Sequence, residues 1–182
     1  CGYSLLLGSF CSMKPTLSIL AWIVVAGALQ AKEPLVVSSP GGRIELQIPA
    51  APSTPQDHRP DFRIRFRGQT LLKGELGLSV HGSNLFEKAV QKKSSRRRSD
   101  STYTLPFGKS NPVRDRFTEL TLDMETGADP VRKIQVIFRV YDDGVAFRHV
   151  IPQQAGVETV EVTDEPDRFQ LVGNPQTWPL YR

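Results

Sequence analysis

Residues 134–151 read IQVIFRVYDDGVAFRHVI, and this stretch decides the fold class. Apolar and polar side chains alternate from Ile134 to Val140, and the apolar positions recur with the same spacing from Val145 to Ile151. A period of two is typical of β-strands that bury one face. The segment between them, Asp-Asp-Gly, ends in an Asp-Gly pair, which is a strong hairpin signal because glycine adopts positive φ without a steric clash. The stretch therefore predicts an antiparallel hairpin.

The same alternation recurs on both sides of this hairpin, whereas helical periodicity does not. Turn-forming Gly, Pro and Asp residues separate the runs, and the four prolines in residues 49–60 predict a loop. About nine strands at this spacing predict an all-β fold, an antiparallel β-sandwich. The further alternating runs are Ile44–Ile48, Phe62–Phe66, Leu76–Val80, Leu120–Met124, Val160–Val162 and Phe169–Val172.

Composition places the chain in the globular class, since 39% of its 182 residues are hydrophobic and 23% are charged. This length fits about one domain of ordinary size, whereas a (β/α)8 barrel needs about 250 residues. The formal net charge of +4 is mild and does not require nucleic acid or a membrane surface as a partner.

The beginning of the chain has the pattern of a targeting segment. Residues 1–12 carry no charge and precede Met13, so we interpret them as an over-extended start. Residues 13–31 combine Lys14, an apolar run at Leu17–Leu29 and small residues, which predicts a signal peptide rather than a stable membrane span, because the run is too short. An uncleaved anchor is the alternative. Residues 32–182 would then be an exported domain, periplasmic or extracellular, that contains no cysteine.

Residues 92–98, KKSSRRR, form the densest cluster of charge. A basic run can bind nucleic acid or another polyanion. This one follows an export signal, contains no aromatic residue and lies between predicted strands. We therefore predict a solvated loop and no nucleic-acid partner.

Local motifs for catalysis are weak. The histidines His58, His81 and His149 form no metal-binding pair, and there is no G-x-S-x-G motif. Carboxylates cluster in residues 123–129, 142–143 and 164–167, and calcium prefers such oxygen ligands. These are also places where turns need aspartate, which is the interpretation we favour. We assign no catalytic residue and no metal ligand in this chain.

Residues 138–148, FRVYDDGVAFR, resemble the FR-x-YDDG-x-AFR signature of the amino-terminal domain of glycoside hydrolase family 97. Four further segments agree in order with that domain, and together they bring the resemblance to about residues 35–180. The run at 92–98 departs from the pattern and indicates a loop insertion. The four segments are residues 39–46, 76–80, 117–122 and 164–178.

The resemblance implies a β-super-sandwich of the galactose-mutarotase-like type, which in full-length members precedes a catalytic (β/α)8 barrel. Those enzymes are calcium-dependent α-glucosidases or α-galactosidases, retaining or inverting, whose catalytic carboxylates and most calcium ligands lie in the barrel. By this resemblance the chain is truncated before the barrel. It would act as a non-catalytic domain that supports and closes the active-site cleft, and would meet α-linked sugars only within the full enzyme.

Two residues are candidates for contacts with that cleft or with the missing barrel, namely Arg148 and His149 at the end of the signature hairpin. Sheet packing is the alternative role for both.

Two other functions stay open. A stand-alone carbohydrate-binding module predicts a row of exposed aromatic side chains. A mutarotase-like enzyme predicts a histidine that faces a glutamate across a cleft, and only analogy of fold supports it. The aromatic residues available for such a row are too few and scattered to show one, namely Tyr103, Tyr141, Trp178 and Tyr181. The His–Glu candidates are His81 or His149 with Glu119 or Glu161.

Overall fold

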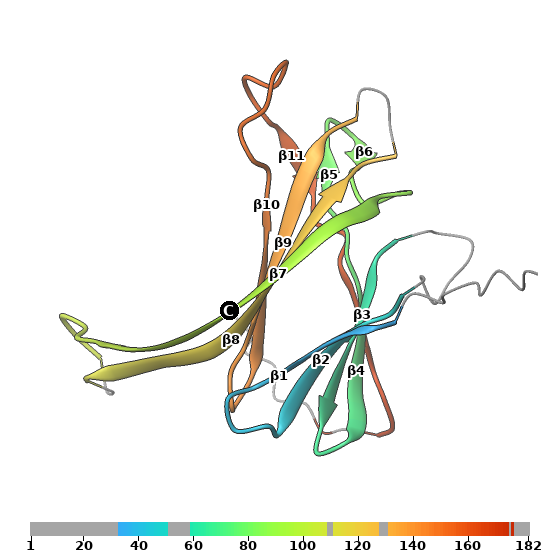
Figure 1. The fold of residues 1–182 in the computed structure, drawn as a ribbon. Coiled ribbons are helices and arrows are strands. Elements are labelled where there is room, and N and C mark those ends of the chain that lie inside the picture. The colour runs from blue at the N-terminus through green and yellow to red at the C-terminus, as the bar shows by residue number, and fades with distance from the viewer. Residues whose placement is uncertain (1–32, 51–58, 109–110, 128–130, 175, 177–182) are drawn as a thin grey trace, which may run out of the picture. The chain divides into compact units, whose positions relative to one another are not determined.

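The computed structural model describes residues 33–50, 59–108, 111–127, 131–174 and 176. The proposed over-extended start, the signal peptide, most of the proline-rich loop, Trp178 and Tyr181 lie outside these residues. All regular elements in the described part are strands (Figure 1). They are β1 (Leu35–Ser38), β2 (Ile44–Ile48), β3 (Asp61–Phe66), β4 (Gln69–Glu75), β5 (Ser79–Val80), β6 (Ser83–Asn84), β7 (Val90–Tyr103), β8 (Val113–Glu125), β9 (Lys133–Val140), β10 (Val145–Val150), β11 (Val162–Asp164) and β12 (Arg168–Leu171).

The strands form three antiparallel sheets, as the alternation of the sequence predicts. The five-stranded sheet has the order β1-β2-β3-β4-β12, and the four-stranded sheet has the order β10-β9-β8-β7. The third sheet is small and has the order β11-β5-β6, with β11 contributed by a segment far along the chain from β5 and β6. The described residues contain no helix, so none of them forms a helical membrane span.

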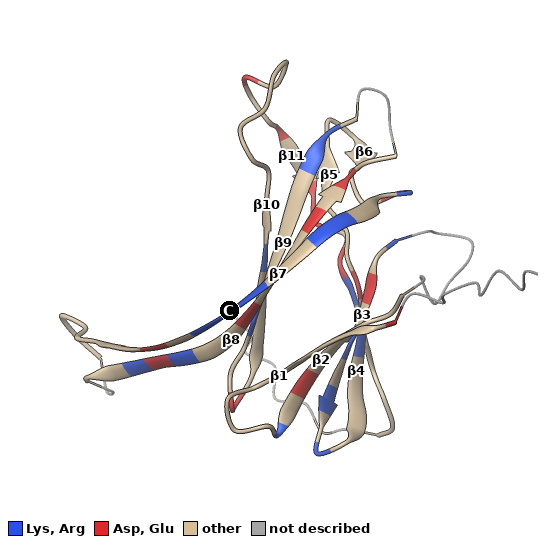
Figure 2. Cartoon of the chain, in the orientation of Figure 1, with Lys and Arg blue, Asp and Glu red and all other residues tan. Residues whose placement is uncertain are grey.

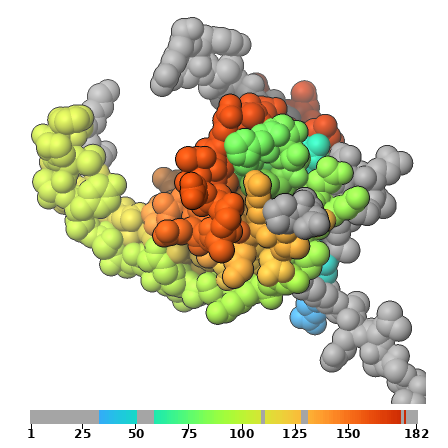
Figure 3. All heavy atoms as spheres, turned by 90° about the horizontal axis from the view of Figure 1, so that it is seen from above, coloured from blue at the N-terminus to red at the C-terminus, as the bar shows by residue number. Residues whose placement is uncertain are grey.

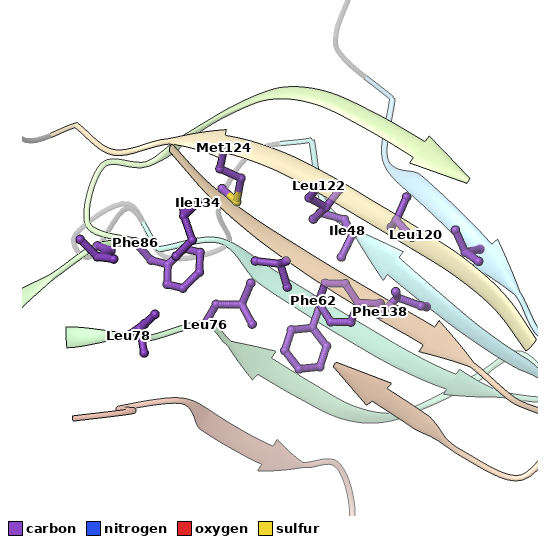
Figure 4. Close-up of a cluster of buried hydrophobic side chains, with 14 of the residues drawn as sticks. Ile48, Phe62, Leu76, Leu78, Phe86, Leu120, Leu122, Met124, Ile134 and Phe138 are labelled. Atoms are coloured by element: carbon purple, nitrogen blue, oxygen red, sulfur yellow. The ribbon is translucent and has the colours of Figure 1, made fainter. Parts of the chain in front are cut away.

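The hydrophobic core lies between the two larger sheets, which confirms the antiparallel β-sandwich. Side chains of β8 and β9 point toward those of β2 and β3 (Figure 4). The ring of Phe62 in β3 lies 5.3 Å from that of Phe138 in β9, and 5.8 Å from that of Phe147 in β10. Burial of this apolar surface is the main force that holds the two sheets together. The largest fully buried side chains are Leu46, Phe62, Leu76, Val80, Phe86, Phe117, Leu120, Leu122, Ile134, Val136, Phe138 and Val140.

The predicted central hairpin is present as β9 and β10, which pair from Val140 with Val145 to Gln135 with Val150. Its turn differs from the prediction. Four residues, Tyr141 to Gly144, connect the strands rather than the three of Asp-Asp-Gly, and none of them has positive φ. Four-residue connections are most often built around a type I turn, whose residues have negative φ, so the glycine is not needed here for its left-handed conformation.

An aspartate of this turn ties the two sheets together. Asp142 accepts a hydrogen bond from the backbone N–H of Gly41, in the turn between β1 and β2. Its other carboxylate oxygen lies 2.8 Å from Nη2 of Arg116 in β8. These bonds hold the pKa of Asp142 below its usual range, the Gly41 N–H contributing most. The first aspartate of the YDDG sequence therefore has a structural role. Its contact with Gly41 links the two sheets, and we call this contact the clip.

The basic run at residues 92–98 is not a loop, which corrects the prediction. It lies inside β7, a strand of 14 residues that pairs with β8 along its whole length. Sequence pattern did not show this strand because most of its residues are exposed on both faces, so no apolar alternation marks it. Lysines and arginines on an edge strand also discourage unwanted pairing with another sheet.

The hairpin of β7 and β8 extends past the rest of its sheet. The pairing between β8 and β9 stops at Thr118 with Val140, whereas β7 and β8 remain paired as far as Tyr103 with Val113. Residues 99–103 and 113–117 thus form a two-stranded arm. Figure 3 shows the end of this arm standing clear of the other strands.

Smaller differences concern the ends of strands. The predicted strand at Leu76–Val80 is regular only at β5, and the preceding residues connect β4 to it while keeping Leu76 and Leu78 buried. Val160 lies outside β11. Of the carboxylates that we ascribed to turns, Asp123 and Glu125 lie in strand β8 and Asp164 lies in strand β11 instead.

Candidate interface site on the outer face of the four-stranded sheet

The two candidate residues from the sequence, Arg148 and His149, lie on opposite faces of the four-stranded sheet. They are consecutive in β10, and successive side chains of a strand point to opposite faces. Arg148 is exposed on the outer face, away from the core. The side chain of His149 is 8% exposed and lies on the core side.

His149 sits among aromatic rings near the two edge strands β10 and β12. Its ring lies 5.1 Å from that of Phe86 and 5.6 Å from that of Phe147. Its Nε2 is 3.8 Å from Oδ1 of Asp167, beyond hydrogen-bond distance, and makes no hydrogen bond within the described part of the chain. Burial lowers the pKa of His149, although Asp167 and Glu165 oppose the shift. A neutral imidazole is therefore favoured at neutral pH.

A row of three charged residues crosses the outer face. Glu119 in β8 pairs in register with Arg97 in β7 and with Arg139 in β9. Arg97 donates two hydrogen bonds to the carboxylate, one of them 2.9 Å long from Nη2 to Oε2, and Arg139 donates one of 2.9 Å from Nε. Glu119 is only 6% exposed. Charge-assisted, bidentate bonds of this kind are among the strongest that proteins form.

An aromatic side chain lies beside this row. The guanidinium carbons of Arg139 and Arg97 lie 4.3 Å and 5.4 Å from the centre of the Phe117 ring. Tyr141 packs against Phe117 at 5.5 Å and donates a hydrogen bond of 3.2 Å to Asp115. Phe117 is 1% exposed, so its ring restricts the two arginine side chains and is not accessible to a ligand.

The electrostatics of Glu119 do not suit a general base. Hydrogen bonds from Arg97 and then from Arg139 hold its pKa below its ordinary value of 4.5, although burial opposes the shift. It also lies on the face opposite His149, so these two residues do not form the facing pair that a mutarotase-like enzyme would need.

Of the other His–Glu candidates, His81 and Glu161 do lie close together, but on an open surface. Nδ1 of His81 lies 3.8 Å from Oε2 of Glu161, and the two side chains are 51% and 76% exposed. His81 and Gly82 both have positive φ and make the two-residue turn between β5 and β6. The position of His81 is thus explained by a hairpin turn.

Arg148 borders a shallow hollow of about 190 Å³ on the outer face of β9 and β10. Its other walls include Ile137, Arg139, Tyr141 and Ala146. The apolar floor and the two guanidinium groups can accept a side chain from another protein surface, with carboxylates favoured by charge. Figure 2 shows that basic and acidic residues alternate only at the start of β8, at residues 114–116, and that the charged residues in the rest of this strand are acidic.

The described residues contain neither a platform for sugar rings nor a metal centre. Their largest exposed aromatic side chains, Tyr103, Phe107 and Phe169, lie on separate elements, and Tyr141 packs against Phe117. No group of three or more His, Cys, Asp or Glu side chains in this part of the chain could hold a metal ion. The calcium implied by the resemblance therefore finds no fitting donor set among these residues.

The sequence proposes Arg148 as an interface residue, and the structure places it beside the hollow of β9 and β10, but no sequence pattern indicates the row around Glu119. The acidic and basic partners are about 20 residues apart in sequence. Only the register of three strands brings them together, and β7 was not predicted as a strand.

Residues 37–182 match the family described as Glycosyl-hydrolase 97 N-terminal. The chain belongs to this family. The family 97 amino-terminal domain that the signature hairpin indicated is thereby confirmed, and it spans most of the chain.

Known relatives of this family 97 domain are much longer than the chain. It is 27% identical over 146 residues to a probable retaining alpha-galactosidase of Streptomyces bingchenggensis, covering 80% of this chain and 21% of that protein. A Glycoside Hydrolase Family 97 enzyme from Pseudoalteromonas sp. strain K8, solved in complex with panose, is 26% identical with a TM-score of 0.66, over 76% of this chain and 20% of the other. A beta-arabinopyranosidase structure is 29% identical with a TM-score of 0.63, over 72% and 20%. The chain thus spans about a fifth of each.

Proposed function

We propose that this chain acts as the non-catalytic amino-terminal domain of an exported α-glycoside hydrolase. In this role the β-sandwich supports a separate catalytic barrel and closes one side of its active-site cleft. The observation that carries the proposal is the family match over residues 37–182 in a chain that spans about a fifth of its enzyme relatives. A (β/α)8 barrel of about 250 residues exceeds the length of this chain.

The state of two carboxylates, Glu119 and Asp142, agrees with a non-catalytic role. Hydrolysis of a glycoside needs two carboxyl groups that flank the bond to be cut. Glu119 is bound by two arginines, and Asp142 is bound by Gly41 and Arg116. Neither side chain is free to act as an acid or a base.

The outer face of the four-stranded sheet is the surface that we assign to the catalytic part. Arg148 is exposed there beside the hollow of β9 and β10, and Glu119 holds Arg139 in place. The buried position of His149 fits a role in packing, so of the two candidates only Arg148 would touch the barrel. Residues 13–31 would direct export, and any calcium would be bound by the catalytic part.

Hydrolysis assays test the catalytic half of the proposal. The 182-residue chain is incubated with p-nitrophenyl α-glucoside and p-nitrophenyl α-galactoside, with an active α-glycosidase as the positive control. We expect no release of p-nitrophenol above buffer. Turnover that purifies with the chain, and that rises in proportion to its concentration, would overturn the non-catalytic role.

The mass of the native exported protein tests the structural half. We expect a species several times larger than this domain that contains peptides from residues 37–182. A mature species of about 150 residues, with no larger form, would contradict the proposal. Binding of α-linked sugars to that species would then support a carbohydrate-binding module instead.

A further inference from the structure

The open edge between the two larger sheets contains a hollow that the proposed interface does not use. Its volume is about 390 Å³, and it lies between the edge strands β1 and β7. Residues 36–38 of β1 form one wall, residues 96–98 of β7 form the other, and Thr118 of β8 also lines it. It belongs to the edge of the sheet opposite β10 and Arg148.

Two arginines of this hollow have no partner in the described part of the chain. Arg97 points to the outer face, where it binds Glu119. Because side chains alternate along a strand, Arg96 and Arg98 point to the other face, toward β1. Neither makes an ion pair or a hydrogen bond with its side chain within the described residues.

A buried hydroxyl without a partner lies next to them. Thr118 is 6% exposed, and its Oγ1 makes no hydrogen bond within the described residues. Thr118 is paired directly with Arg98 in the register of β7 and β8, so the two side chains share one face. Buried hydroxyls normally have a hydrogen-bond partner, and a donor that lacks one points to a missing acceptor.

We propose that this hollow binds an oxyanion, a phosphate or sulfate group that is either a free ion or an ester on a sugar. The guanidinium groups of Arg96 and Arg98 donate N–H bonds to its oxygens, in the forked geometry that suits phosphate and sulfate. The hydroxyl of Thr118 donates a third bond. The site takes an acceptor-rich anion because all three groups can donate and the two arginines carry positive charge.

An alternative role for the basic run is to prevent the edge strand from pairing with other sheets, but this role explains fewer of the observations. Lysine and arginine on an edge strand reduce pairing with other sheets, and Lys92 and Arg97 would serve that purpose as well. Those two residues already meet carboxylates, Glu125 and Glu119. Edge protection gives no reason for the unpartnered hydroxyl of Thr118.

Calorimetric titration of the 182-residue chain tests the site, with sodium phosphate, sodium sulfate, glucose 6-phosphate and glucose as probes at constant ionic strength. We expect saturable binding of the three anions and none of glucose. Arg98→Gln and Thr118→Val should each weaken binding about tenfold or more. Arg132→Gln is the matched control, because it removes one arginine from the connection between β8 and β9, directly before Lys133, and it should leave binding unchanged.

The titrations also distinguish the source of the anion. Glucose 6-phosphate that binds at least about tenfold tighter than phosphate would identify an ester on a sugar, whereas equal affinity would identify the free ion. Far-ultraviolet circular dichroism shows that each variant keeps its strands. The proposal is overturned if the response does not saturate, or if Arg132→Gln weakens it as much as Arg98→Gln does.

Discussion

At the scale of single residues, the contact between Gly41 and Asp142 joins two turns of different sheets. A β-carbon built on Gly41 would lie 2.6 Å from Oδ1 of Asp142, too close for a non-bonded contact. Substitution Gly41→Ala should therefore break the clip and lower Tm by about 3 °C or more. Gly144→Ala is the control, because nothing lies within 4 Å of its β-carbon and its φ is not positive, and Tm should change by less than about 1 °C. Differential scanning calorimetry measures both, and equal shifts would contradict the role of Asp142.

Glu119 is the second residue whose substitution should be costly. Glu119→Gln leaves two guanidinium groups facing each other without a carboxylate, and should lower the free energy of unfolding by about 1–3 kcal/mol in urea denaturation. Glu125→Gln is the control: its carboxylate pairs with an exposed lysine, and the loss should stay under about 1 kcal/mol.

The pH dependence of the same variant gives an independent test. Because the folded pKa of Glu119 lies below 4.5, its stabilising effect is complete above pH 4.5 and is lost as pH falls through the folded pKa. The difference in Tm between wild type and Glu119→Gln should narrow between about pH 6 and about pH 3. A difference that stays constant over this range would mean that the carboxylate charge is not what matters.

At the scale of elements, the turn between β5 and β6 contains a residue that is poorly suited to it. His81 has a φ of 49°, and Gly82 follows it with 78°. Asparagine tolerates this left-handed conformation better than other residues with a β-carbon, whereas valine tolerates it poorly. We expect His81→Asn to raise the free energy of unfolding by about 0.5 kcal/mol and His81→Val to lower it by about 1 kcal/mol. Equal effects of the two substitutions in urea denaturation would show that the backbone conformation is unimportant.

Elements whose apolar residues alternate with polar ones could be predicted from the sequence, and elements without that alternation could not. β2 and β9 alternate strictly between buried and partly exposed residues, and their strands were found. β7 is largely exposed along its length, so its 14 residues carried no apolar signal. Its neighbour β8 was found only where apolar side chains enter the core. The part of β8 in the arm, residues 113–117, lies beyond the core and could not be predicted as a strand for the same reason.

The candidate site shows the same difference between features that a local sequence pattern predicts and features that it does not. Arg148 could be placed at the end of a predicted hairpin because its neighbours in sequence define both the strand and the face. The row of Arg97, Glu119 and Arg139 depends on the registers of three strands, which no local pattern contains. The clip between Gly41 and Asp142 joins residues 101 positions apart, so no local sequence pattern predicts it either.

At the scale of the whole molecule, His149 makes stability depend on pH near neutrality. It lies where β10 and the segment before β12 meet, and burial holds its folded pKa below 6.5. The unfolded chain therefore binds a proton more readily, so stability is complete above pH 6.5 and falls as pH decreases through the interval down to the folded pKa. Asp167 and Glu165, which face it, limit the size of this effect.

Substitution His149→Phe should remove that dependence. The phenyl ring fits among Phe86 and Phe147, so the free energy of unfolding above pH 7 should stay within about 1.5 kcal/mol of wild type. Between about pH 7 and about pH 5, wild type should lose more stability than His149→Phe. Parallel slopes for the two proteins in urea denaturation would refute the assignment to His149.

The two-stranded arm has a consequence for the exchange of amide hydrogens with solvent. From residues 118 to 125, β8 has a partner on both sides, so its amides should exchange slowly and uniformly. From residues 113 to 117 it has a partner on one side only, and in an antiparallel pair every second amide then points to water. A deuterium-exchange record by NMR should change at residue 118 from alternating fast and slow amides to continuous protection. Slow exchange at every amide of the arm would show that another strand has been added along its free edge.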